Sequence, residues 1–348
     1  MKFGVGFPTC REGTTYGVPF VRPEDFPRLA RHAEELGFYS LWGNDHLTTP
    51  LAIRATQDAP PNFYEPLLTY ASLAFVTHRI RFLIGVLVVP EREIILLAKQ
   101  LATLDQLCNG RVMLGVGIGS YREEFEAVHP DLKGANRGQM LQEGIEALRQ
   151  LFSERRASYA GKYIRFNDIE LAPKPVQQPF PLLLNAHADV ALERVGAAAD
   201  GWIVAALPAD RTAQARSVVD AAARRAGRDP RSIGTHFQIW LSFGNDRRAA
   251  VEKLKRSQHW RRMLAVGRDA SEDAQLRRFG SGSLLGSPAE VIEQIGALET
   301  HAGVQHLGVV MLGETVQELM DDMELFAREV MPAFADGQGN AETDSALD

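Results

Sequence analysis

The segment 79–120 restricts the fold of this chain more than any other part of the sequence. Residues 83–89 form an almost continuous apolar run, which suits a strand buried on both faces. A proline ends the run, and Glu91 and Glu93 follow where the N-terminus of a helix favours negative charge. Apolar residues then recur at the i, i+3, i+4, i+7 spacing of a helix with one buried face, and they are Ile94, Leu97, Ala98, Leu101 and Leu104.

A second apolar run, residues 112–116, comes after Asn109 and Gly110, which form a typical helix stop. Parallel strands need such a helical crossover because a tight hairpin cannot join them. We therefore predict a β-α-β unit over this segment. Both predicted strands carry glycines near their ends, which usually mark a close approach of backbone or ligand. These glycines are Gly85, Gly115, Gly117 and Gly119.

The same alternation of strand and helix runs through the rest of the chain. Eight apolar runs, each followed by a helical stretch, lie at about 3–7, 39–43, 83–89, 112–116, 182–185, 200–205, 233–243 and 305–312. This count predicts one (β/α)8 (TIM) barrel over residues 1–334. A doubly wound sheet, the structural alternative, would have fewer strands and a phosphate loop near the N-terminus. In the helix predicted at 65–77, the residues expected to face inward are Leu67, Leu68, Ala71 and Phe75.

Three segments interrupt this alternation of strand and helix, and we predict them to be insertions. They lie near 44–64, 157–180 and 257–283. The first is a long polar loop, the second alternates enough for a small hairpin, and the third has no clear period. Loops of this length in a compact domain are usually functional or disordered. Residues 335–348 are polar and form a predicted C-terminal tail.

Composition argues against several classes of partner. The 348 residues carry a net charge of −6 with a pI near 5.9, so nothing indicates nucleic acid or an anionic membrane surface as a partner. No run approaches the roughly 20 apolar residues of a membrane span. The two cysteines, Cys10 and Cys108, lie far apart and the nine histidines are scattered, so we predict no metal site. The chain starts without a signal peptide, and we expect a cytosolic protein.

Active sites of (β/α)8 barrels form at the C-terminal ends of the strands. Asp45 and His46 follow the second predicted strand. Histidine exchanges protons most readily near neutral pH, so His46 is a candidate acid or base. The alternative is a loop histidine beside a turn-forming aspartate.

Two further strand ends are candidates. After the fourth strand, Ser120 stands where the dinucleotide-binding fingerprint needs its last glycine, so that interpretation fails. The glycine-rich end at 115–119 either lets backbone approach a cofactor or forms a tight turn. After the fifth strand, residues 185–187 lead into a helix whose free amides suit a phosphate, unless Asp189 caps them.

Taken together, these features resemble the bacterial luciferase-like oxidoreductases, in particular their deazaflavin (coenzyme F420)-dependent branch. The resemblance covers nearly the whole chain, from residue 3 to about 334. The motifs that carry it are Gly37-Phe-Tyr-Ser-Leu-Trp-Gly-Asn-Asp45-His46, Gly85-Val86-Leu87, Leu107-Cys-Asn-Gly-Arg111-Val-Met-Leu-Gly115-Val-Gly-Ile-Gly119, Arg122-Glu-Glu-Phe125 and Gly286-Ser-Pro288.

The resemblance implies a barrel that binds a flavin-type ring at its C-terminal face, with His46 at the reactive edge as proton donor or acceptor. It implies a cis peptide between Gly85 and Val86 against the back of the ring, and help from the 257–283 segment in closing the substrate cavity. Other residues that it implies in cofactor binding are Asp45, Gly117, Gly119 and Ser120 around the ring, and Asn185, Ala186 and His187 around its side-chain phosphate. It also suggests a homodimer.

One departure affects the substrate. The sugar-phosphate dehydrogenases of this family have glutamate where this chain has Ser120, so that substrate class is in doubt. The resemblance predicts a deazaflavin-dependent enzyme that transfers hydride to or from a small organic substrate. Two alternatives stay open: an FMN-dependent two-component monooxygenase of the same family, and a flavin-binding barrel without catalysis. No role is assigned to Arg122 or Glu123.

Overall fold

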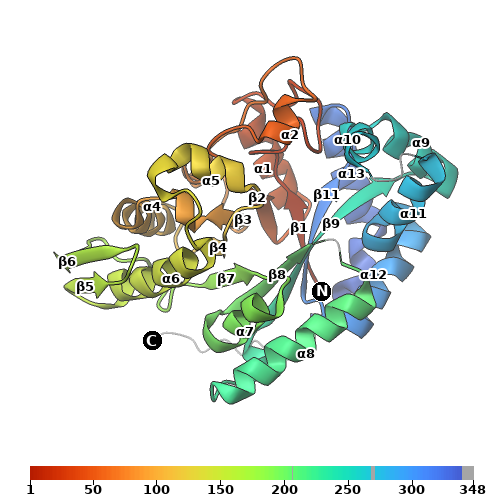
Figure 1. Ribbon diagram of the computed structural model, residues 1–348. Coiled ribbons are helices and arrows are strands. Elements are labelled where there is room, and N and C mark those ends of the chain that lie inside the picture. Colours follow the sequence, from red (N-terminus) through yellow and green to blue (C-terminus); the bar gives the residue numbers. More distant parts are fainter. Residues whose placement is uncertain (206, 268–270, 339–348) are drawn as a thin grey trace.

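The computed structural model describes residues 1–205, 207–267 and 271–338. Eight parallel strands close into a barrel in which β8 pairs with β9 and β11 pairs with β1 (Figure 1). The barrel strands, in spatial order, are β1 (Lys2–Gly6), β2 (Ser40–Gly43), β3 (Arg81–Val88), β4 (Val112–Gly117), β7 (Leu182–Asn185), β8 (Gly201–Ala205), β9 (Gly234–Phe243) and β11 (His306–Met311). The predicted (β/α)8 barrel is confirmed.

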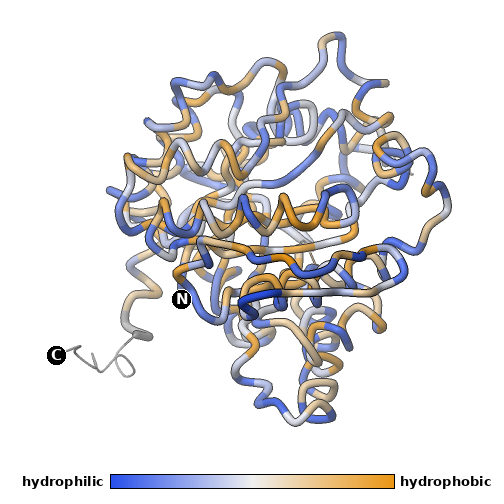
Figure 2. Tube along the Cα trace, turned by 90° about the vertical axis from the view of Figure 1, so that its left-hand side faces the viewer, coloured by the Kyte–Doolittle hydropathy of each residue, from blue (hydrophilic) through white to orange (hydrophobic). Residues whose placement is uncertain are grey.

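Each barrel strand is followed by a helix that covers the outside of the barrel. These helices are α1 (Asp25–Glu35), α3 (Pro66–Leu73), α4 (Ile94–Leu107), α6 (Arg137–Ser153), α7 (Asp189–Ala198), α8 (Ala209–Arg225), α12 (Pro288–Ala302) and α13 (Val316–Glu329). Their apolar faces pack on the strands in one large core. Apolar segments run through the middle of the molecule, and hydrophilic segments are frequent around its outside (Figure 2).

Local sequence signals explain where these helices begin and end. Glu93 caps α4, because its carboxylate accepts from the amides of Ile95 and Leu96 at 3.1 and 2.6 Å. Beyond the end of α4, Asn109 and Gly110 adopt positive φ angles of 52° and 75°. The prediction that Glu91 and Glu93 both stand at the N-terminus of this helix is wrong for Glu91. Glu91 lies in the short helix η1 (Val89–Glu91), one turn before α4, and its side chain is buried.

The predicted inward face of α3 is also wrong in part. Leu67, Tyr70 and Leu73 face the core, whereas Leu68 and Phe75 are 68% and 71% exposed. The helix carries apolar residues around most of its surface, so the apolar period alone cannot select the face that packs inward.

The connecting segments hold elements that the sequence pattern did not reveal. The 44–64 loop contains α2 (Leu51–Arg54), and β4 leads into α5 (Arg122–Val128) and then η2 (Pro130–Leu132). The predicted hairpin is present with shifted bounds, as β5 (Ala157–Ala160) and β6 (Arg165–Ile169), and it projects from the outside of the barrel (Figure 1). A short helix, η3 (Pro230–Ser232), precedes β9.

The 257–283 segment, predicted without regular structure, is helical. It contains α10 (Gln258–Val266) and α11 (Glu272–Gly282), which follow α9 (Arg247–Arg256) and precede the short strand β10 (Leu284–Gly286) beside β9. These elements form a small core together with Leu312, which follows β11. Its other members are Ala250, Leu254, Trp260, Met263, Phe279 and Leu285. Mostly polar helices with few apolar anchors have a weak period, which explains the missed prediction.

Parts of two predicted segments lie outside the described residues. These are positions 268–270 of the third insertion and residues 339–348 of the C-terminal tail, which follow the short helix η4 (Met331–Gln338). Across the described ranges, no helix is both long and apolar enough to span a bilayer.

The interior of the barrel is filled around Trp42 on β2. Its indole packs with Leu83, Met113, Leu183 and Ile203, which project inward from β3, β4, β7 and β8. Glycines on β3 and β11 make room for it, because a Cβ at Gly85 or Gly308 would overlap the ring.

Replacing Gly308 by alanine should therefore lower the free energy of unfolding. Overpacking of a filled core costs about 1–3 kcal/mol. Gly296 supplies the control, since it lies within α12 with open space around its Cβ position, and G296A should stabilise by about 0.5–1 kcal/mol. Urea unfolding of both variants measures the difference, and equal stability of G308A and wild type would contradict the packing around Trp42.

Candidate active site

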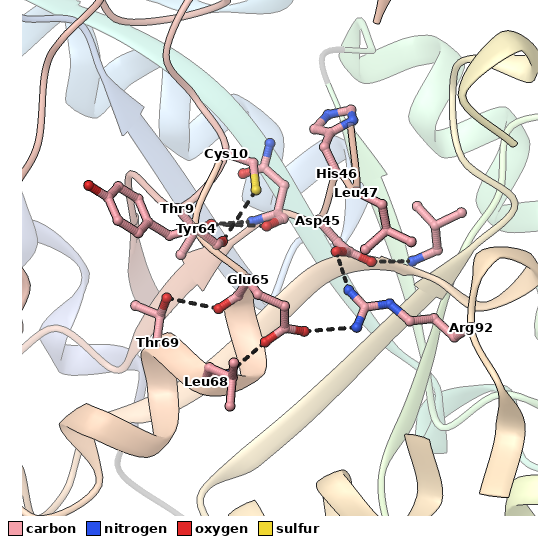
Figure 3. A network of polar contacts seen from close by, with 12 residues as sticks. Thr9, Cys10, Asp45, His46, Leu47, Tyr64, Glu65, Leu68, Thr69 and Arg92 are labelled. Atoms are coloured by element: carbon pink, nitrogen blue, oxygen red, sulfur yellow. Dashed lines mark hydrogen bonds and ion pairs between the residues drawn. The ribbon is translucent and has the colours of Figure 1, made fainter. Parts of the chain in front are cut away.

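Asp45 ties the C-terminal ends of two neighbouring strands together. One carboxylate oxygen accepts from the amide of Val88 at 3.0 Å, at the end of β3, and the other accepts from the Arg92 guanidinium. The same guanidinium donates to Glu65 at 2.8 Å (Figure 3). Burial raises the pKa of the Asp45 carboxyl, while the ion pair with Arg92 opposes this. Both oxygens already hold protein groups, so the contact of Asp45 with a cofactor stays a prediction.

His46 points away from this network (Figure 3). Its Nδ1 atom lies 2.9 Å from Oε2 of Glu124, and the centroid of its ring lies 5.2 Å from that of Phe63 and 5.9 Å from that of Tyr121. The side chain is 15% exposed, and Nε2 makes no hydrogen bond to the part of the chain that the structure describes. His46 therefore has one anchored nitrogen and one nitrogen left for a ligand.

Glu124, the partner of His46, was not predicted. It lies on α5 and is buried, and its Oε1 accepts from the amides of Leu47 at 2.9 Å and Thr48 at 3.2 Å. The motif around it is part of the family resemblance, but α5 has no apolar period that would have indicated which of its residues face inward.

A second buried carboxyl, Glu91, lies nearby. It is 5% exposed, and within the described ranges neither of its oxygens has a hydrogen-bond partner. Both neighbouring arginines are engaged elsewhere: Arg92 with Asp45 and Glu65, and Arg137 with the backbone carbonyls of residues 118 and 119. Burial, followed by the charges of Glu124 and Asp45, raises the pKa of Glu91 to about 8, so this group carries a proton at neutral pH.

The glycines predicted near the site create close approaches of backbone. The peptide bond between Gly85 and Val86 is cis. A Cβ at Gly117 would lie 2.8 Å from the side chain of Val86 and 3.8 Å from that of Asn185. Gly117 thus allows β4 to pack tightly between β3 and β7, and the roles of Gly85, Val86 and Gly117 toward a cofactor stay predictions.

The remaining predicted residues line one cavity of about 690 Å³. Gly119 and Ser120 contribute from the end of β4, and residues 185–187 contribute from the end of β7. The N-cap residue of α7 is Ala188, which has no polar side chain to cap the helix, so the alternative that Asp189 caps these amides is wrong. Asp45 and His46 do not line this cavity.

Arg194 on α7 also lines the cavity and was missed from the sequence. Partial burial lowers its pKa, and it makes no ion pair with the residues described. Uncapped helix amides and a cation without a carboxylate partner favour an anionic group such as a phosphate. The residues present therefore fit a cofactor with a phosphate-bearing side chain. In the described ranges, no group of three or more His, Cys, Asp or Glu side chains is arranged to hold a metal ion.

The family model of the luciferase-like monooxygenases matches residues 1–306. The chain belongs to this family. The F420-dependent hydroxymycolic acid dehydrogenase of Mycobacterium tuberculosis (strain ATCC 25618 / H37Rv) is 30% identical over 295 residues, which cover 81% of this luciferase-like chain and 75% of that protein. The FMNH(2)-dependent dimethylsulfone monooxygenase of Pseudomonas putida is 26% identical over 328 residues, covering 88% and 86%.

A solved structure shows the same fold. The monooxygenase RslO1 from Streptomyces bottropensis superposes with a TM-score of 0.80 over 96% of this chain and all of that one, at 24% identity, and shows the same fold. The luciferase-like chain spans 65% of the length of the uncharacterized mycobacterial relatives that it matches at 35% identity over 185 residues. Members of the family with oxidoreductase and monooxygenase activity occur among its relatives, and they use either F420 or FMN.

The buried carboxyl of Glu91 predicts a pH-dependent contribution to stability. Its pKa is raised in the folded state from 4.5 to about 8, so the stability that it contributes is complete below pH 4.5 and is lost as the pH rises through about 8. Glutamine cannot ionise, so E91Q should gain stability relative to wild type between pH 5 and pH 9. Urea unfolding at both pH values measures this change.

E35Q, at an exposed position that ends α1, is the control and should follow wild type at both pH values. If E91Q and wild type kept a constant difference from pH 5 to pH 9, Glu91 would not hold a proton in the folded protein.

Proposed function

We propose that this protein is a deazaflavin-dependent oxidoreductase that transfers hydride to or from a small organic substrate, with His46 as proton donor or acceptor. The observation that carries the proposal is His46 itself, held through Nδ1 at the C-terminal end of β2 with Nε2 left for a ligand. Of the two named relatives that match most of the chain, the hydroxymycolic acid dehydrogenase has the higher identity, 30%, and is F420-dependent. This supports the deazaflavin as the coenzyme.

The cavity residues supply a place for the coenzyme. In this proposal Asn185, Ala186, His187 and the first amides of α7 hold its phosphate, and Arg194 adds a positive charge. Gly119 and Ser120 line the coenzyme at the end of β4. When bound, the deazaflavin supplies the two-electron hydride carrier, and the protein supplies orientation, exclusion of water and a proton path at His46.

The second candidate is an FMN-dependent two-component monooxygenase. The match to the dimethylsulfone monooxygenase over 88% of the chain favours it, because that relative is named as dependent on reduced FMN. Both coenzymes carry a phosphate, so the cavity suits either. The third candidate, a flavin-binding barrel without turnover, gains no support from the His46–Glu124 pair, which orients a group able to exchange protons.

Coenzyme titration separates the first two candidates. Fluorescence titration of the purified protein with F420 and with FMN under identical conditions should give micromolar binding of F420 and weaker binding of FMN. A preference for FMN would favour the monooxygenase. H46A should bind F420 as wild type does, but turn over alcohol or carbonyl substrates about 10²–10⁴-fold more slowly, because it lacks the proton-exchanging group.

Three outcomes would contradict the proposal in different places. Binding of neither coenzyme would remove the cofactor roles of the cavity residues. Strict dependence of turnover on oxygen would exclude simple hydride transfer. Full activity of H46A would remove His46 from the mechanism.

We also propose a homodimer that buries neighbouring faces of α3 and α4. Leu68 and Phe75 at α3 and Leu96 on α4 are exposed apolar side chains, and the two helices pack side by side. Light scattering should give about twice the 38.4 kDa of one chain, and L68E with F75E should reduce this to a monomer. Exposed Val190 on α7 supplies a control, since V190E should leave the mass unchanged.

A further inference from the structure

Glu124 makes contacts that decide how His46 can hold its proton. The carboxylate lies on α5, and its three hydrogen bonds all go to residues that follow β2. Two of them, from the amides of Leu47 and Thr48, occupy Oε1 at 2.9 and 3.2 Å. The third joins Oε2 to Nδ1 of His46 at 2.9 Å. The carboxylate is therefore fixed at one oxygen by backbone donors and presents the other to the imidazole.

This arrangement sets the donor in the Glu124–His46 bond. A carboxylate can only accept hydrogen bonds, so Nδ1 must carry the proton that lies between them. A neutral imidazole with its proton on Nδ1 has a lone pair on Nε2. Nε2 is the nitrogen without a hydrogen bond in the described part of the chain, and the ring packs near those of Phe63 and Tyr121.

We propose that Glu124 is a positioning residue that fixes His46 in the tautomer with the proton on Nδ1 and the lone pair on Nε2. The inference rests on the proposed function only in giving His46 a role in turnover. Neighbouring Glu91 supports it, because a neutral carboxyl beside Glu124 removes a competing negative charge and leaves Glu124 as the acceptor for the imidazole.

The fixed tautomer narrows the substrate class. In its neutral form His46 accepts a proton at Nε2, so the resting enzyme is prepared for a substrate with an O–H or N–H proton to lose, such as an alcohol or an amine. In the reverse direction the imidazolium returns the same proton from Nε2. Glu124 keeps its Nδ1 hydrogen bond in both states and does not exchange a proton itself.

The E124Q variant tests this assignment on the coenzyme-free protein. The two backbone amides need an acceptor, so the glutamine oxygen should face them and its NH2 group should face His46. Nδ1 then becomes the acceptor, and the proton moves to Nε2. In nitrogen NMR of protein labelled at histidine, with His46 assigned by its loss in H46N, the signal of the nitrogen bearing the lone pair should move from Nε2 to Nδ1.

Two further variants separate positioning from folding. E124D keeps a carboxylate and should keep the wild-type tautomer. E123Q changes the adjacent residue on α5, which makes no hydrogen bond to His46, so this variant should leave the spectrum unchanged. In turnover, E124Q should lower kcat by at least about 10²-fold with coenzyme affinity retained, and E124D should recover part of that loss.

The outcomes distinguish this inference from the proposed function. A lone pair on Nδ1 in the wild type, or the same tautomer in wild type and E124Q, would overturn the role of Glu124. The expected exchange of nitrogen signals together with no binding of F420 or FMN would overturn the proposed function and leave the positioning role in place.

Discussion

The structure depends on how the barrel interior accommodates Trp42. Its indole occupies the space between facing strands, and Gly85 and Gly308 leave that space open because any larger residue would overlap the ring. In the amide orientation that satisfies both neighbours, the Gln238 oxygen accepts from Trp42 Nε1 at 3.0 Å and from Arg11 at 2.9 Å. Close packing inside a small barrel leaves little freedom for the strand that carries the largest side chain. The position of β2, and of the residues that follow it, is thereby set.

The rigid interior fixes the strand ends, and these ends carry the residues of the candidate site. Arg92 joins Asp45 to Glu65, and Glu124 joins α5, which follows β4, to the loop after β2. The ends of β2, β3 and β4 are thus held by charged hydrogen bonds. Asp45, Glu65 and Glu124 already bring three carboxylates to these strand ends, and Glu91, whose pKa burial raises to about 8, adds no fourth negative charge at neutral pH. His46 and the cavity lined by Asn185, Ala186 and His187 lie at different strand ends of the barrel. This is the arrangement that the proposed coenzyme, with a reactive ring and a distant phosphate, would need.

The fold could be predicted from the sequence because eight alternations of apolar strand and amphipathic helix leave few other architectures. Asp45 and His46 could be found since they directly follow a buried strand. Glu124, Glu91 and Arg194 could not, for two reasons. Glu124 lies on a short polar helix without an apolar period, and the significance of Glu91 and Arg194 depends on which partners they lack in three dimensions. The inward face of α3 and the helices after residue 257 were also mispredicted. The spacing of apolar residues is informative only where one helix face packs on the main core.

The two backbone amides that bind Glu124 have a consequence for how this site can diverge. Every residue except proline offers an N–H at positions 47 and 48, so the hydrogen bonds to Glu124 do not depend on the side chains at these positions. Exposed Leu47 can be exchanged for a residue of another size or polarity without loosening the carboxylate that orients the imidazole. Point mutations in the segment beside His46 can therefore change the surface next to the proposed acid–base residue without changing the hydrogen bonds that hold it.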